Sequence, residues 1–114
     1  MKLSIVIPAY NEEATIEELL LRVQTADLRE IEKEIIVVDD ASRDCTAQIA
    51  GRFPGIRVVR HVRNGGKGAA VKTGIDASTG DLVIIQDADL EYDPGDYHTV
   101  IQPLVDGKAD AVMG

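Results

Sequence analysis

The chain of 114 residues is poor in cysteine and in basic side chains. Its single cysteine, Cys45, excludes an internal disulfide and fits a reducing compartment, and we expect it to be a small apolar residue on a helix. Twelve lysines and arginines stand against twenty acidic residues, which gives a formal net charge of −8. This balance argues against a basic surface for nucleic acid and against unaided docking on an anionic membrane.

The sequence also has no apolar run that approaches the roughly 18 residues of a membrane span. The first apolar run is broken by Pro8 and followed by Asn11 and two glutamates, so it is too short for a signal peptide. We therefore expect a cytoplasmic location. Peripheral contact with the cytoplasmic face of a membrane would come only through an acceptor or through residues outside this segment.

Short apolar segments alternate with helical patterns along the chain. Strands are predicted at residues 3–7, 34–38, 56–60, 81–86 and 109–113. Helices are predicted from Asn11 as N-cap to about Thr25, from Asp44 with Cys45, Ile49 and Phe53 inside, over 69–78, and from Pro94 to about Val105. This alternation predicts an α/β domain with an open, doubly wound, mostly parallel sheet and helices on both faces.

Two of these segments indicate how they pack. The 56–60 strand is more polar than the others, which places it nearer an edge of the sheet. The 69–78 helix has a face of small residues, Ala70, Gly74 and Ala77, which lets it lie close to the sheet.

Three acids at alternate positions, Asp87, Asp89 and Glu91, follow the apolar run at 82–85. In an extended backbone alternate side chains point to the same side, so Asp87 and Asp89 can converge on one point. Hard oxygen donors without histidine or cysteine suit Mg²⁺ or Mn²⁺, which takes further ligands from water and from a substrate's phosphates. The alternative is a solvated loop in which the acids cap the next helix.

Polar residues also follow the other strands, at 10–12, 39–40 and 64–67. Ligands of open α/β sheets bind outside the carboxyl ends of the strands, so agreement among four strand ends favours a binding site there. Lys67 lies in a glycine-rich turn at a helix start, where it either approaches phosphates or stays a solvated loop lysine.

Other polar residues are assigned less specific roles. Asp39 directly follows a buried strand and needs a partner, which the N–H of a base can supply. Asp40 is expected to act as a cap or to point to solvent. His61 and His98 are expected at the surface, because neither lies in a strand-end motif.

Four segments resemble, in order and spacing, the nucleotide-binding half of family 2 glycosyltransferases: residues 7–13, 37–44, 64–70 and 87–89. The branch that they resemble contains dolichyl-phosphate mannose synthases and bacterial polyprenyl-phosphate glycosyltransferases. The resemblance implies a Rossmann-like GT-A domain over residues 1–114. It also implies inverting transfer by single displacement from a GDP- or UDP-sugar to a lipid-phosphate or glycan acceptor, with the acceptor-binding part outside these residues.

The resemblance implies a role for each matched residue. Nucleotide contacts fall on Pro8, Ala9, Tyr10, Glu12, Asp39, Lys67, Asp87 and Ala88. Tyr10 would stack on the base, in preference to packing on the sheet, and Asp39 would hydrogen-bond it. Asp89 would hold the metal that bridges the diphosphate, and Asp87 would contact the nucleotide or a metal-bound water; these two are the catalytic candidates. The third metal position is often Gln in this branch and is Glu91 here, which leaves the donor open.

Three other classes of protein share part of this pattern. A phospho-receiver domain requires a lysine on a late strand, but the first lysine after Asp87 is Lys108. A dinucleotide-binding dehydrogenase requires a glycine-rich turn after the first strand, where this chain has Pro-Ala-Tyr-Asn-Glu. A nucleotidyltransferase would carry a glycine-rich loop with Arg or Lys at the same place. A nucleotide-binding domain without transferase activity remains an open alternative.

Overall fold

The computed structural model describes residues 1–88 and 111–113 of the chain. Within them, five parallel strands form one sheet in the order β3-β2-β1-β4-β5. The elements in chain order are β1 (Lys2–Ala9), α1 (Ile16–Thr25), β2 (Glu32–Asp39), α2 (Thr46–Gly51), β3 (Arg57–Arg60), α3 (Lys67–Ala77), β4 (Leu82–Ile85) and β5 (Ala111–Met113). The strand order reverses direction at β1, which pairs with β2 on one side and β4 on the other.

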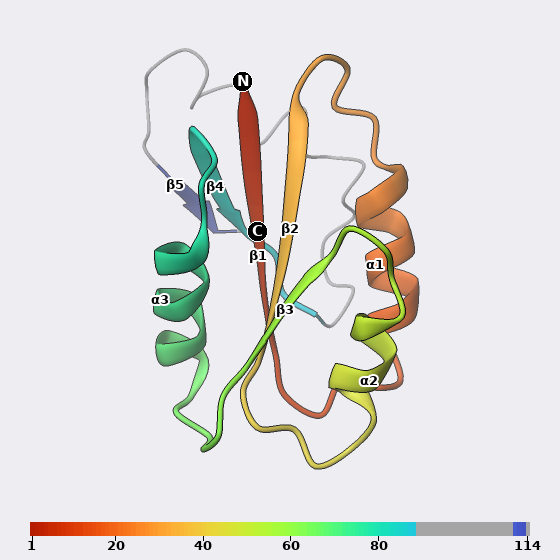
Figure 1. The fold of residues 1–114 in the computed structure, drawn as a ribbon, viewed down its shortest axis with the longest axis vertical. Coiled ribbons are helices and arrows are strands. Elements are labelled where there is room, and N and C mark those ends of the chain that lie inside the picture. Colours follow the sequence, from red (N-terminus) through yellow and green to blue (C-terminus); the bar gives the residue numbers. More distant parts are fainter. Residues whose placement is uncertain (89–110, 114) are drawn as a thin grey trace.

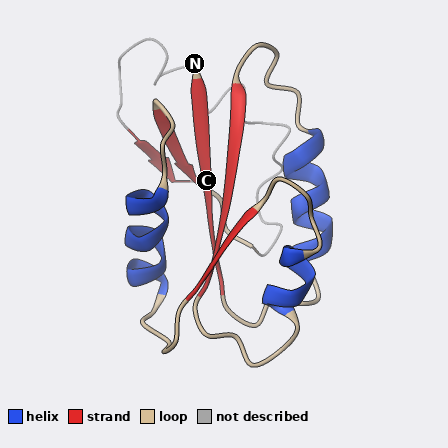
Figure 2. Cartoon of the chain, viewed as in Figure 1, coloured by secondary structure: helices blue, strands red, loops and turns tan. Residues whose placement is uncertain are grey.

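Helices cover both faces of the sheet. Figures 1 and 2 show α1 and α2 on one side and α3 on the other. Alternate residues of β1 divide between the two cores: Leu3, Ile5 and Ile7 pack on the α1 and α2 side, and Val6 packs on the α3 side. The predicted doubly wound α/β fold is confirmed.

The small face of α3 meets the sheet at close range, as predicted. Gly74 lies over the fully buried Val6, and a Cβ atom added to Gly74 would come within 2.2 Å of Val6 Cγ1. No larger residue fits there without displacing the helix or the strand. Glycine therefore sets the depth at which α3, with Lys67 at its first turn, sits on the sheet.

Most predicted boundaries agree with the structure within a few residues, and β3 lies at the edge as expected. Two local predictions are wrong. α1 starts at Ile16, with Thr15 rather than Asn11 at its N-cap. Cys45 is exposed, and the fully buried positions of α2 are Thr46 and Ala50. Ile49 and Phe53 pack against the core as predicted, but are only partly buried.

The helix predicted from Pro94 to Val105 lies outside the described residues. Among the helices that are described, none combines the length and the apolar character needed to cross a bilayer.

Candidate functional site

A cavity of about 410 Å³ opens beyond the carboxyl ends of β1 and β4. This is the size of a small-molecule site, and the reversal of strand order beside β1 is where such sheets bind ligands. Its lining residues are Pro8, Ala9, Tyr10, Glu12, Asp40, Lys67, Ala70, Asp87 and Ala88. All the predicted nucleotide-binding residues except Asp39 are among them, so the structure brings together side chains from four separate strand ends.

An ion pair crosses this cavity. Lys67 Nζ, from the first residue of α3, lies 2.6 Å from Oδ1 of Asp87, which follows β4. The Lys67 side chain is 53% exposed and that of Asp87 25% exposed. The first turn of a helix also carries backbone N–H groups that no intrahelical carbonyl accepts. The cavity thus offers a cation, a carboxylate and a helix N-terminus side by side.

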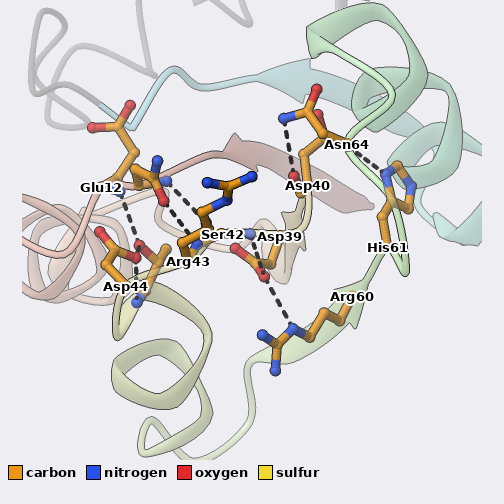
Figure 3. A network of polar contacts seen from close by, with 11 residues as sticks. Glu12, Asp39, Asp40, Ser42, Arg43, Asp44, Arg60, His61 and Asn64 are labelled. Carbon is orange, nitrogen blue, oxygen red and sulfur yellow. Dashed lines mark hydrogen bonds and ion pairs between the residues drawn. The ribbon is translucent and has the colours of Figure 1, made fainter.

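Asp40 is buried, and its carboxylate organises the glycine-rich turn before α3. The N–H groups of Gly65 and Gly66 donate to Oδ1 and Oδ2, each at 2.8 Å. Asn64 Nδ2 donates to the Asp40 carbonyl (Figure 3). The Asp40 N–H in turn donates to the Ala9 carbonyl. Asp40 therefore ties the end of β1 to the turn that carries Lys67.

His61 completes this network and is only partly exposed, with 18% of its side chain accessible. Its Nδ1 lies 2.7 Å from Asp40 Oδ1, and its Nε2 lies 2.8 Å from Thr73 Oγ1 on α3. Burial by itself raises the pKa of the Asp40 carboxyl, but hydrogen bonds from Gly65, His61 and Gly66 outweigh it and lower that pKa.

Of the two roles expected for Asp40, pointing to solvent is wrong, whereas its carboxylate accepts N–H groups just before α3, as a cap does. The surface position expected for His61 is wrong because the ring is mostly buried against Asp40 and Thr73. His98 lies outside the described residues.

Asp39 is fully buried and lies beside a second hollow, not in the lining of the first cavity. Its Oδ2 accepts the Ser42 N–H at 3.3 Å and pairs with Arg60 Nε at 3.4 Å. Oδ1 has no hydrogen-bond partner among the described residues. Ser42 and Arg60 also line the second hollow, of about 410 Å³. A buried carboxylate oxygen is thus left without a donor among the described residues, and the two residues that contact its partner oxygen line the second hollow.

The loop after β1 is held by the loop after β2, which explains why α1 begins late. Asn11 has a left-handed backbone, with φ 53°, and its Oδ1 accepts the Arg43 N–H at 2.9 Å. The Asn11 and Glu12 N–H groups donate to Ser42 Oγ and Thr46 Oγ1 (Figure 3). These contacts use the groups that would otherwise start a helix, and they hold Glu12 at the cavity.

Comparison with known proteins identifies the family of the chain. The sequence model of glycosyl transferase family 2 matches residues 4–114. The chain belongs to glycosyl transferase family 2. A dolichol-phosphate mannosyltransferase of Pyrococcus furiosus is 34% identical over 98% of the chain and 32% of that protein. An undecaprenyl-phosphate 4-deoxy-4-formamido-L-arabinose transferase of Pseudomonas aeruginosa is 42% identical over 91% of the chain and 32% of that protein.

A solved structure gives the same result for the fold. Glucosyl-3-phosphoglycerate synthase of Mycobacterium tuberculosis, crystallised with Mn²⁺, UDP-glucose and phosphoglyceric acid, superposes with a TM-score of 0.78 at 33% identity. The match covers 94% of the chain and 40% of the synthase. The chain thus spans about a third of the length of the two transferases.

The predicted metal ligands of this family 2 chain are only partly described. Asp89 and Glu91 lie outside the described residues, and among the described ones no group of three or more His, Cys, Asp or Glu could hold a metal. Asp87 is described, and its carboxylate already holds a cation in the cavity, the Lys67 ammonium group. A carboxylate oxygen is the kind of ligand that Mg²⁺ and Mn²⁺ take, so Asp87 fits one position of such a site.

Several residues of this site were missed by reasoning from the sequence of the family 2 chain. Asp40 and His61 carry no local signal for their pairing, because they meet only when β2 and β3 lie side by side. Thr15 donates to the Ala88 carbonyl at 2.7 Å and so ties the start of α1 to the end of β4. A backbone acceptor 73 positions away cannot be read from the sequence around Thr15.

Proposed function

We propose that this family 2 chain binds a nucleoside-diphosphate sugar with Mg²⁺ or Mn²⁺. We further propose that the protein transfers the sugar to a polyprenyl or dolichyl phosphate. The observation that carries the proposal is the cavity in which Asp87 and Lys67 meet at the first turn of α3. A diphosphate needs a cation, N–H donors and a carboxylate that can hold a divalent metal, and these groups lie together there.

The diphosphate would lie between Lys67 and Asp87. Asp87, with Asp89 and Glu91 from the sequence, would hold the metal, which supplies Lewis-acid stabilisation for charge on the leaving diphosphate. Lys67 would donate to a phosphate oxygen, and its position is fixed by the turn that Asp40 holds. Pro8, Ala9, Tyr10 and Glu12 would line the nucleoside.

The base would find a partner at Asp39. A buried carboxylate oxygen without a hydrogen bond is costly, and an N–H group of a ligand removes that cost. Oδ1 of Asp39 is such an oxygen among the described residues. Uracil offers one ring N–H, whereas guanine offers a ring N–H and an amino group. Both satisfy Asp39, so the choice between UDP and GDP stays with experiment.

The acceptor is proposed from the relatives, whose names specify dolichol phosphate and undecaprenyl phosphate. A phosphate oxygen is already an anionic nucleophile, so no general base is required. In a single displacement it bonds to the anomeric carbon while the bond to the diphosphate oxygen breaks, and the nucleoside diphosphate leaves with the electron pair. This step inverts the anomeric configuration. The acceptor would bring the protein to the cytoplasmic face of a membrane.

The transfer itself is tested with the complete protein, a polyprenyl phosphate, and UDP- or GDP-sugars in the presence of Mn²⁺ or Mg²⁺. We expect a lipid-extractable sugar phosphate whose anomeric configuration, read by NMR coupling constants, is opposite to that of the donor. A product of retained configuration would refute single displacement. Nucleotide binding without any product would indicate a binding domain instead.

A further inference from the structure

The ion pair between Lys67 and Asp87 raises a question of competition, because a metal and Lys67 need the same carboxylate. Asp87 Oδ1 lies 2.6 Å from Lys67 Nζ, which is closer than many surface ion pairs and leaves no room for a divalent ion between them. A free metal ion must therefore displace an ammonium group before it reaches this oxygen.

We infer that Lys67 makes the cavity selective for a metal–diphosphate complex over the free metal ion. This inference rests on the proposed function, because it assigns two successive partners to Lys67. Without ligand, Lys67 neutralises Asp87. When a diphosphate arrives with the metal, Lys67 moves to a phosphate oxygen and leaves the carboxylate to the metal.

The structure allows this exchange because the Lys67 side chain is long and more exposed than that of its partner. The Lys67 backbone is fixed as the first residue of α3, after a turn whose two N–H groups bind Asp40. Its side chain is 53% exposed and can swing within the cavity, whereas the Asp87 side chain is 25% exposed. The long lysine side chain can therefore reach a second position in the cavity from a backbone that stays in place.

Lys67 affects the binding of the two ligands in opposite directions. Binding of a free metal ion breaks a partly exposed ion pair, which costs up to about 1 kcal/mol, or roughly fivefold in affinity. A metal–diphosphate complex supplies a new anionic partner for the displaced ammonium group and avoids that loss. By linkage, each of metal and diphosphate raises the affinity for the other, and Lys67 contributes to that coupling.

The test compares Lys67→Met with the parent in two titrations: Mn²⁺ alone, followed by the EPR signal of free Mn²⁺, and Mn²⁺ with inorganic diphosphate. Inorganic diphosphate is used because it carries no base, so the test does not depend on which nucleotide the protein binds. Lys67→Met should bind Mn²⁺ alone about fivefold more tightly and should bind the Mn²⁺–diphosphate complex more weakly than the parent. Lys67→Arg keeps the charge and should resemble the parent in both titrations.

Lys72→Met is the matched control for loss of one positive charge on the same helix. Lys72 lies on α3, pairs with Asp76 and is not part of the cavity lining. It should change neither titration. Equal or weaker binding of free Mn²⁺ by Lys67→Met, or an equal gain in Lys72→Met, would overturn the inference.

Failure of the proposed function gives a different result. In that case the parent would show no metal-assisted binding of UDP or GDP, while the comparison of free Mn²⁺ between Lys67→Met and the parent would still decide whether the ion pair excludes the metal.

Discussion

The carboxylate of Asp40 links three parts of the site, and replacing Asp40 by Asn tests that link at constant size. Oδ1 and Oδ2 accept the N–H groups of Gly65 and Gly66, each at 2.8 Å, and Oδ1 lies 2.7 Å from His61 Nδ1. An amide has one oxygen and one NH₂ group. In either orientation it therefore points a donor at an N–H group that now donates to a carboxylate.

The cost follows from these contacts. Hydrogen bonds to a charged group contribute about 1.5–3 kcal/mol each, and the variant loses at least one and gains a donor facing a donor. Solvent reaches the exposed turn at Gly65 and reduces the loss. We expect Asp40→Asn to lower the free energy of unfolding by about 2–3 kcal/mol. It should also weaken metal-dependent nucleotide binding, because the turn before Lys67 loses its anchor.

The dependence on pH has a definite sign. The folded-state pKa of Asp40 is lowered from its ordinary value of 3.8, so its contribution is present above that value and is lost as the pH falls below it. The difference between parent and Asp40→Asn should therefore be constant near neutral pH and shrink below about pH 4.

Urea unfolding of the parent and Asp40→Asn from pH 7 downward measures both quantities. Asp76→Asn is the control, because Asp76 is exposed and pairs only with Lys72 in the interactions described; it should stay within about 0.5 kcal/mol of the parent. If the free energy of unfolding of Asp40→Asn also stays within about 0.5 kcal/mol of the parent, and nucleotide binding is unchanged, the anchoring role is refuted.

Three further predictions concern the fold and the metal. Gly74→Ala should destabilise by about 1–3 kcal/mol through overpacking, and should be neutral or stabilising in a Val6→Ala background, as urea midpoints would show. Burial raises the pKa of Glu34, but hydrogen bonds from Ser4 and Thr79 and the Lys2 charge lower it to about 2. Glu34→Gln should therefore have a free energy of unfolding lower than that of the parent by at most about 3 kcal/mol above pH 4.5, and this difference should shrink toward pH 2. Asp89→Ala should abolish metal-dependent nucleotide binding in calorimetry while leaving the ligand-free melting temperature nearly unchanged; a large fall would mean a structural role.

The parts of the fold that rest on local pattern were predictable. The run at β1 is apolar on successive residues because both faces of a central strand are covered, and this pattern does not depend on distant partners. The small residues of α3 likewise predict close packing, and the short distance between Gly74 and Val6 confirms it. The same patterns locate the strand ends, so most of the cavity residues are predictable from the sequence.

The rest depends on contacts between distant residues. Asn11 followed by two glutamates has the composition of a helix start, but its backbone and side chain bind the 42–46 loop instead. Asp40 could be predicted as a cap, but nothing near it in the sequence reveals His61 as its second partner. Asp39 was expected to meet a base, and the structure shows which of its oxygens lacks a donor among the described residues.

The central claim is that this chain binds a nucleoside diphosphate through a divalent metal. Isothermal titration with UDP and with GDP, each with and without Mn²⁺, tests it most directly, on this chain and on the complete protein. We expect one of the two nucleotides to bind, and its binding to require the metal. Binding that is indifferent to Mn²⁺, or the absence of binding by the complete protein, would contradict it.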